Sequence, residues 1–121
     1  MIRLILAGER PQSWNKHWAG THWTKRKKER DRVHMLVRSE IDPDNAVIFN
    51  SPVEITINVW FKSRPLDVFN IVTKPYVDAL IGWYIVDDSP DHVPVTHTGS
   101  FIDKRRPRME IEIKPVSGAP F

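Results

Sequence analysis

The stretch V53-E-I-T-I-N-V-W-F61 decides the fold class, because apolar and polar side chains alternate along its length. Successive side chains of an extended strand point to opposite sides, so every second residue here would face the protein interior. The residues that would share this face are Val53, Ile55, Ile57 and Val59. Pro52 stands just before the stretch. We predict a strand over residues 53–61 with one face in the core.

Three further strands are expected on either side of this one. Ile2–Leu6 alternates around Arg3 and is followed by the chain-breaking residues Gly8 and Pro11. Two more strands are predicted near Val93–Ile102 and Arg108–Ile113, joined by a basic turn. Asp42–Asn45, which reads D-P-D-N, has the composition of a turn between elements.

Two helices complete the expected architecture. The first would be capped by Thr21 or Thr24 and run to about Glu40, with an apolar stripe of Val33, Leu36 and Val37. The second would begin between Asn70 and Lys74, with Thr73 as a possible cap, because Pro75 is tolerated only in a first turn. It would end at Gly82, and Trp83–Val86 is a candidate for a short strand beside it. We therefore predict an α+β fold, a small mixed and largely antiparallel sheet with two main helices.

The composition limits the possible functions. A chain of 121 residues suits a single domain, which we place at residues 1–116, with a frayed tail at residues 117–121. Because the chain contains no cysteine, disulfides, thiolate catalysis and cysteine zinc sites are excluded. The net charge of +3 weakly favours an acidic partner. The apolar opening Met1–Ala7 is too short for a signal peptide or a membrane span, so we expect a cytoplasmic protein without a membrane partner.

A cluster of acidic and amide residues interrupts otherwise apolar sequence between Asp67 and Asp88. Its polar members are Asp67, Asn70, Lys74, Asp78, Asp87 and Asp88. Like charges gathered in such a setting repel one another and lose hydration, and a divalent cation relieves both costs. Hard oxygen ligands suit magnesium or manganese, which also bind substrate phosphate oxygens. The cluster predicts metal-dependent phosphate chemistry, with Lys74 neutralising charge in the transition state.

A structural interpretation of the same residues stays open. Lys74 and Asp78 stand four positions apart and would form an ordinary exposed ion pair on a helix, worth roughly 0.3–0.5 kcal/mol. Asp87-Asp88-Ser89-Pro90 would then be only a turn. The complete set is more specific than these parts.

The cluster resembles the signature of the RusA family of Holliday junction resolvases, which reads Asp-x-Asp-Asn-x-x-Lys, then Asp-Ala-Leu, then Asp-Asp. The matching residues are Asp67, Asn70, Lys74, Asp78-Ala79-Leu80 with Gly82, and Asp87-Asp88 with Val93. Pro11, Ser13, Asn15 and Lys16 resemble the family's opening loop, and His22-Trp23-x-Lys25-Arg26 resembles phage-encoded relatives. The resemblance covers about residues 9–114. It implies a homodimeric nuclease of a bacterial cell or phage that cuts four-way DNA junctions with magnesium.

Under this resemblance, Asp67, Lys74 and Asp88 are the expected catalytic residues. The expected metal ligands are Asp67, Asp88, Asp87 and Asn70, with Mg²⁺ as the cofactor and Mn²⁺ as a substitute. No small-molecule cofactor is expected. The chain departs from the family pattern in two ways, because Phe69 stands where the second aspartate is expected and one extra residue separates Asn70 from Lys74.

Two basic segments are candidates for binding DNA phosphates, together with the opening loop. The expected nucleic-acid contacts are Asn15, Lys16, Lys25, Arg26, Lys27, Lys28, Arg30, Lys104, Arg105 and Arg106. The first segment is equally well explained as a solvated helix face interleaved with Glu29 and Asp31. Trp14, Trp18 and Trp23 are candidates for stacking on unpaired bases, although core packing is expected for at least one of them, with Trp23 the first choice.

These observations predict a structure-selective endodeoxyribonuclease that resolves four-way junctions as a homodimer. Two alternatives remain. The loss of one ligand aspartate favours a noncatalytic protein that binds junctions or other structured DNA. A small scaffold protein, whose acidic residues form surface ion pairs, is the alternative from a different functional class.

Overall fold

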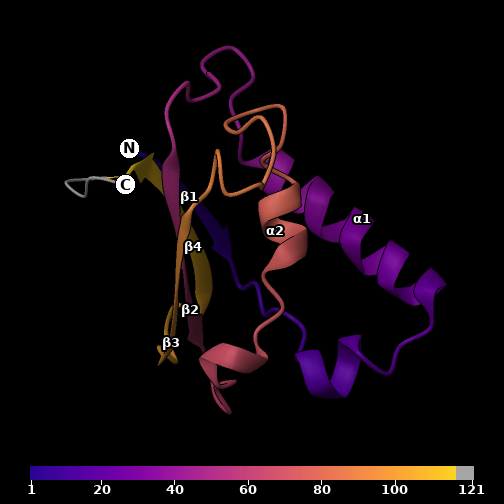
Figure 1. The fold of residues 1–121 in the computed structure, drawn as a ribbon. Coiled ribbons are helices and arrows are strands. Elements are labelled where there is room, and N and C mark those ends of the chain that lie inside the picture. The colour runs from indigo at the N-terminus through magenta and orange to yellow at the C-terminus, as the bar shows by residue number, and fades with distance from the viewer. Residues whose placement is uncertain (117–121) are drawn as a thin grey trace.

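We describe residues 1–116 of a computed structural model, shown in Figure 1. The elements in chain order are β1 (Ile2–Ala7), the π-helical turn η1 (Trp14–Trp18), α1 (Trp23–Ser39), β2 (Val53–Phe61), the 3₁₀ turn η2 (Val68–Asn70), α2 (Lys74–Asp78), β3 (Val95–Ile102) and β4 (Arg108–Pro115). The tail expected at residues 117–121 lies outside the described residues.

The strands form one open sheet in the order β1-β4-β2-β3. β4 pairs antiparallel with both β1 and β2, whereas β2 and β3 are parallel. Parallel neighbours need a long crossover, and the segment between β2 and β3 supplies it, with η2 and α2 along its course. The fold is therefore α+β with a mixed, largely antiparallel sheet, as the sequence predicts.

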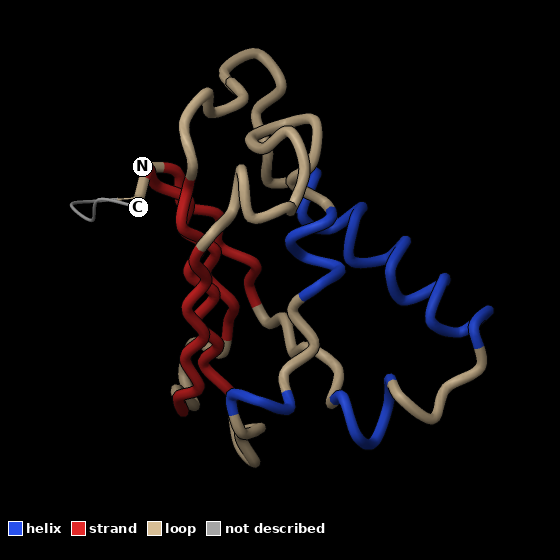
Figure 2. Tube along the Cα trace, viewed as in Figure 1, coloured by secondary structure: helices blue, strands red, loops and turns tan. Residues whose placement is uncertain are grey.

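The helices lie on one side of the sheet, and the core lies between them and the sheet (Figure 1, Figure 2). Along β2 the buried residues alternate with partly exposed ones, as the period-two pattern predicts. The apolar residues of the described chain that lose all measurable contact with solvent are Leu6, Val37, Ile55, Val59, Ala79, Leu80, Met109, Ile111 and Ile113. The opposite face of the sheet carries mainly polar and charged side chains.

The first helix follows the sequence prediction except at its start. Val33 and Val37 are buried against the core, as expected from the apolar stripe. The residue at the N-cap is His22 rather than Thr21 or Thr24, and the His22 ring accepts a hydrogen bond from the backbone amide of Thr24. A histidine ring nitrogen can take the place of the usual hydroxyl or carboxylate acceptor at this position.

The second helix is shorter than its sequence predicts. It begins at Lys74 after Thr73, and Pro75 lies in its first turn as expected. It ends at Asp78, well before Gly82, and Asn70 belongs to the separate turn η2. Asn70 and Lys74 therefore do not share a helical face, which corrects the expectation that Asn70, Lys74 and Asp78 align.

The loops differ from the prediction at one place. Asp42–Asn45 forms the expected turn, in which the Asp42 carboxylate accepts a hydrogen bond from the Asp44 amide. Trp83–Val86, a candidate strand, is instead part of a tight turn where Gly82, with a φ of 85°, donates its N–H to the Ile85 carbonyl. Only glycine adopts this left-handed conformation without strain. Within residues 1–116, no helix is both long and apolar enough to cross a membrane.

Candidate functional site

Lys74 brings together two of the carboxylates that the sequence singled out. Its side-chain nitrogen Nζ lies 3.3 Å from Asp78 Oδ1 and 3.1 Å from Asp88 Oδ2. Asp78 is one helical turn further along α2, whereas Asp88 arrives from the loop that follows. The hydrogen bond to Asp88, with that to Asp78, raises the pKa of Lys74 although partial burial opposes this. Lys74 is therefore a fixed positive charge at neutral pH.

Asp87 contacts residues outside this group. Its Oδ1 accepts a hydrogen bond from the Ser89 backbone amide at 2.8 Å, and its Oδ2 lies 3.9 Å from His92 Nε2. Hydrogen bonds from Ser89 lower the pKa of Asp87. The adjacent pair Asp87-Asp88 thus divides its two carboxylates between a local turn and Lys74.

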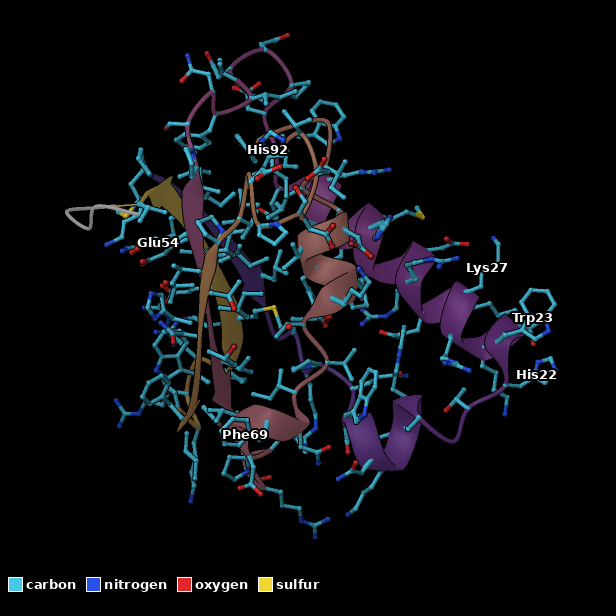
Figure 3. All side chains as sticks on the ribbon, viewed as in Figure 1. His22, Trp23, Lys27, Glu54, Phe69 and His92 are labelled. Atoms are coloured by element: carbon cyan, nitrogen blue, oxygen red, sulfur yellow. The ribbon has the colours of Figure 1, made fainter. Side chains whose placement is uncertain are left out.

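Asp67 and Asn70 lie in a different surface hollow. Asp67 precedes η2, and the Asn70 side-chain oxygen accepts a hydrogen bond from the Asn15 amide at 2.9 Å. The same hollow is lined by Phe69, whose exposed fraction is 97%. Figure 3 shows Phe69 and His92 at opposite ends of the molecule. Among the described residues, no hydrogen bond or ion pair connects Asp67 with Lys74 or Asp88.

The arrangement of acids bears on the expected metal. Residues 1–116 contain no group of three or more His, Asp or Glu side chains arranged to hold a metal ion. The ion shared by Asp67 and Asp88, with Asp87 and Asn70 beside them, stays a prediction. The donor chemistry of Asp78 and Asp88 nevertheless suits magnesium, which needs only one or two protein carboxylates beside water and phosphate oxygens. These two residues would hold such an ion.

The first half of α1 carries most of its positive charge without partners. Lys27 pairs with Asp31 at 3.0 Å, and Arg32 pairs with Glu29 and Glu9. In contrast, Lys25, Arg26, Lys28 and Arg30 make no ion pair with any described residue. The interpretation as a solvated, self-compensated face therefore accounts for only part of this segment, and an excess of positive charge remains for phosphates.

A second basic surface lies in the turn between β3 and β4. The amides of Arg105 and Arg106 both donate to Asp103 Oδ1 at 3.1 Å, which lowers the pKa of Asp103. Lys104, Arg105 and Arg106 all expose their side chains. Ile102, just before this turn, lines the same shallow hollow as Asp67. The basic turn therefore adjoins the Asp67 end of the molecule rather than the Lys74 cluster.

Sequence reasoning missed a buried polar network behind the cluster. The carboxylate of Glu9, 8% exposed, accepts two hydrogen bonds from Arg32 at 3.2 and 2.8 Å and one from the Tyr76 hydroxyl at 2.6 Å. Burial and the negative charge of Glu9 raise the pKa of Tyr76. The network joins the end of β1 to both helices. A single charged residue in a loop gives no periodic signal that would have revealed it.

Neither a comparison with protein-family models nor a comparison with curated protein sequences finds a match for this chain.

Proposed function

We propose that this protein is a structure-selective endodeoxyribonuclease that resolves four-way DNA junctions by magnesium-dependent phosphodiester hydrolysis. The observation that carries the proposal is the contact of Lys74 with Asp78 and Asp88, two acids from separate segments. The resemblance of this segment to the RusA signature supports the choice of substrate. The mild excess of positive charge is consistent with a nucleic-acid partner.

Lys74 would stabilise the charge that develops on the scissile phosphate. Its raised pKa keeps the ammonium protonated, so it acts as an electrostatic group and not as a general base. Asp78 and Asp88 hold the ammonium in place and are the candidate ligands for Mg²⁺, with Mn²⁺ as a substitute. When bound, the ion would supply charge neutralisation at the phosphate and a more acidic bound water.

Two basic surfaces would position the junction. The unpaired cations of α1 and the turn at residues 104–106 would bind backbone phosphates without reading sequence, which suits recognition of a branched shape. Asn15 and Lys16, exposed in η1, are further candidate contacts. A homodimer would present two equivalent sites to the two equivalent strands of a symmetric junction.

A noncatalytic junction-binding protein is the second candidate. Two observations favour it. Phe69 projects into solvent where the family pattern expects an aspartate, and Asp67 lines a hollow that neither Lys74 nor Asp88 lines. Such a protein would retain the basic surfaces and bind branched DNA without cutting it.

Cleavage of synthetic DNA separates the two candidates. Labelled four-way, splayed and linear substrates would be incubated with Mg²⁺ or Mn²⁺ and with parent protein, Asp88→Asn or Asp91→Asn. Asp91 is an exposed acid of the same loop and provides the matched control. The proposal predicts junction-selective cutting by parent and Asp91→Asn and its loss in Asp88→Asn. Tight junction binding without cutting under either metal would select the noncatalytic protein instead.

A further inference from the structure

Two tryptophans and three cations surround one hollow at the start of α1. Its lining residues are Trp18, Trp23, Arg26, Lys27 and Arg30, and its volume is about 540 Å³. Trp18 ends η1 and Trp23 begins α1, and the loop between them is closed by the Thr21 amide, which donates to the Trp18 carbonyl at 3.1 Å. A volume of this size is in the range of small-molecule binding sites.

The indole of Trp23 is not part of the core, contrary to the sequence expectation. It is 64% exposed, and the buried residues of α1, Val33 and Val37, lie only in the second half of the helix. Figure 3 shows Trp23 with His22 and Lys27 at the free end of α1, away from the sheet. An exposed indole beside cations is an arrangement that stacks on bases and binds phosphates.

The cations around these rings are incompletely satisfied. Arg26 and Arg30 make no ion pair with any described residue, and Lys27 has only Asp31 as a partner. The Nε donor of Arg26 is buried and has no hydrogen-bond acceptor within residues 1–116. A buried unpaired donor costs free energy unless a ligand or water satisfies it, and a phosphate oxygen is a suitable acceptor.

We propose that this hollow binds one unpaired nucleotide of single-stranded DNA, with its base stacked on an indole and its phosphate held by the cations of α1. The inference deepens the proposed function, on which it rests for the choice of DNA, because a branch point offers bases that have left the stack. The aromatic surface requires an exposed base, so intact duplex lacks the group that the hollow recognises.

The test is equilibrium binding of a fluorescein-labelled oligothymidylate of about eight nucleotides, a length suited to a short single-strand site. Binding is followed by fluorescence anisotropy without divalent metal. Trp23→Ala should weaken binding about 5- to 100-fold, and Trp23→Phe should recover much of it because a ring remains. The control is Met35→Ala, which removes a side chain that is 76% exposed on the same helix and should leave affinity unchanged.

Salt dependence tests the phosphate contact separately. Arg26→Gln should reduce the slope of log affinity against log salt concentration by about 0.7, the value for one lost phosphate contact on a single strand. Arg38→Gln, at the other end of α1, should leave the slope as in the parent protein. Equal affinities of Trp23→Ala and Met35→Ala, or an unchanged slope in Arg26→Gln, would overturn the inference.

The outcome is independent of cleavage. Asp88→Asn, which should abolish the proposed hydrolysis, should bind the oligonucleotide as tightly as the parent protein. If the protein cuts no junction but its oligonucleotide binding depends on Trp23, the proposed nucleotide site is supported and the proposed nuclease activity is wrong. If the protein cuts junctions but Trp23→Ala binds the oligonucleotide as tightly as the parent protein, the proposed nuclease activity is supported and the proposed nucleotide site is wrong.

Discussion

Lys74 and Asp88 stand fourteen positions apart in the chain, yet Lys74 Nζ lies 3.1 Å from Asp88 Oδ2. The contact joins the first residue of α2 to the loop that follows the helix. Both side chains are substantially exposed, at 69% and 42%. Because solvent screens such pairs, the contact contributes less than about 1 kcal/mol to stability. Loss of this contact alone should therefore change the stability little.

Replacing Lys74 should therefore separate activity from stability. Lys74→Gln should lower the junction-cleavage rate by roughly 100-fold or more, the order expected when one electrostatic group at a reacting centre is removed. The free energy of unfolding should change by less than about 1 kcal/mol. Single-turnover cleavage and urea denaturation measure the two quantities, and Lys74→Arg, which keeps the charge, should retain more activity. A large stability loss with little change in rate would contradict this interpretation.

Glu9 should show the opposite behaviour, because it is buried. Glu9→Gln keeps the shape but removes the charge that binds Arg32 and the Tyr76 hydroxyl. We expect a loss of roughly 1–3 kcal/mol in the free energy of unfolding, since groups that lose a partner in the interior are left unsatisfied. Arg32 is partly solvated, with 47% of its side chain exposed, which keeps the loss below that of a fully buried pair.

Urea denaturation measures this loss. The matched control is Asp31→Asn, which removes an acid paired with Lys27 on the surface, where both side chains are more than half exposed. That change should leave the free energy of unfolding nearly unchanged, because water screens the pair. If Glu9→Gln proved as stable as Asp31→Asn, the buried network would have no role in holding the two helices together.

The sequence predicted the strands well because their signal is local. The alternation along residues 53–61 fixes which side chains are buried, and the burial of Ile55, Ile57 and Val59 confirms it. The stripe containing Val33 and Val37 likewise identified the core-facing side of α1. In both cases the period of the apolar residues is enough to predict which side chains are buried in the core.

The candidate site was less predictable because it depends on tertiary placement. The pairing of Lys74 with Asp78 follows from helical spacing, but the arrival of Asp88 does not. Asn70 does not share a helical face with Lys74, because the chain forms η2 and then extends before α2, which a continuous helical pattern does not anticipate. The exposure of Trp23 was not predicted either. The sequence around an aromatic residue at the start of a helix does not show whether that end of the helix packs against the sheet.

Gly99 should be difficult to replace, because its neighbours occupy the space that a side chain needs. A Cβ there would lie 2.2 Å from Asn58 Oδ1 and 2.6 Å from the Phe101 ring. That ring stacks on Trp60 with centroids 5.3 Å apart. Gly99→Ala should displace the Asn58 amide and the Phe101 ring. We expect the free energy of unfolding to fall by about 1 kcal/mol, the lower end of overpacking costs, because the far end of a side chain can shift more easily than backbone.

Thermal or urea unfolding tests this, with Gly20→Ala as control because nothing lies within 4 Å of a Cβ at that position. In a Phe101→Ala background, Gly99→Ala should cost less, since one of the two obstacles is gone. If Gly99→Ala lowered the free energy of unfolding equally with and without the Phe101 ring, that ring would not be the group that obstructs a side chain at position 99.

His34 should make the protein less stable in mild acid. Partial burial, followed by the positive charge of Arg38, lowers the pKa of His34 below its ordinary value of 6.5, and nearby Asp78 opposes the shift only partly. As pH falls below 6.5, the unfolded chain therefore takes up the proton before the folded chain does. Stability is lost over this window and levels off once the folded protein is also protonated.

Replacing His34 should remove that part of the pH dependence. The urea midpoint would be measured at about pH 7.5 and about pH 5.5, on the two sides of the ordinary histidine value. His34→Gln should lose less stability between these conditions than the parent protein. His97→Gln, an exposed position on β3, should behave like the parent. The buried Nε2 of His34 has no hydrogen-bond partner in the described chain, so no hydrogen bond at this atom stabilises the protonated form. An acid sensitivity of His34→Gln equal to that of the parent would assign the effect to the carboxylates instead.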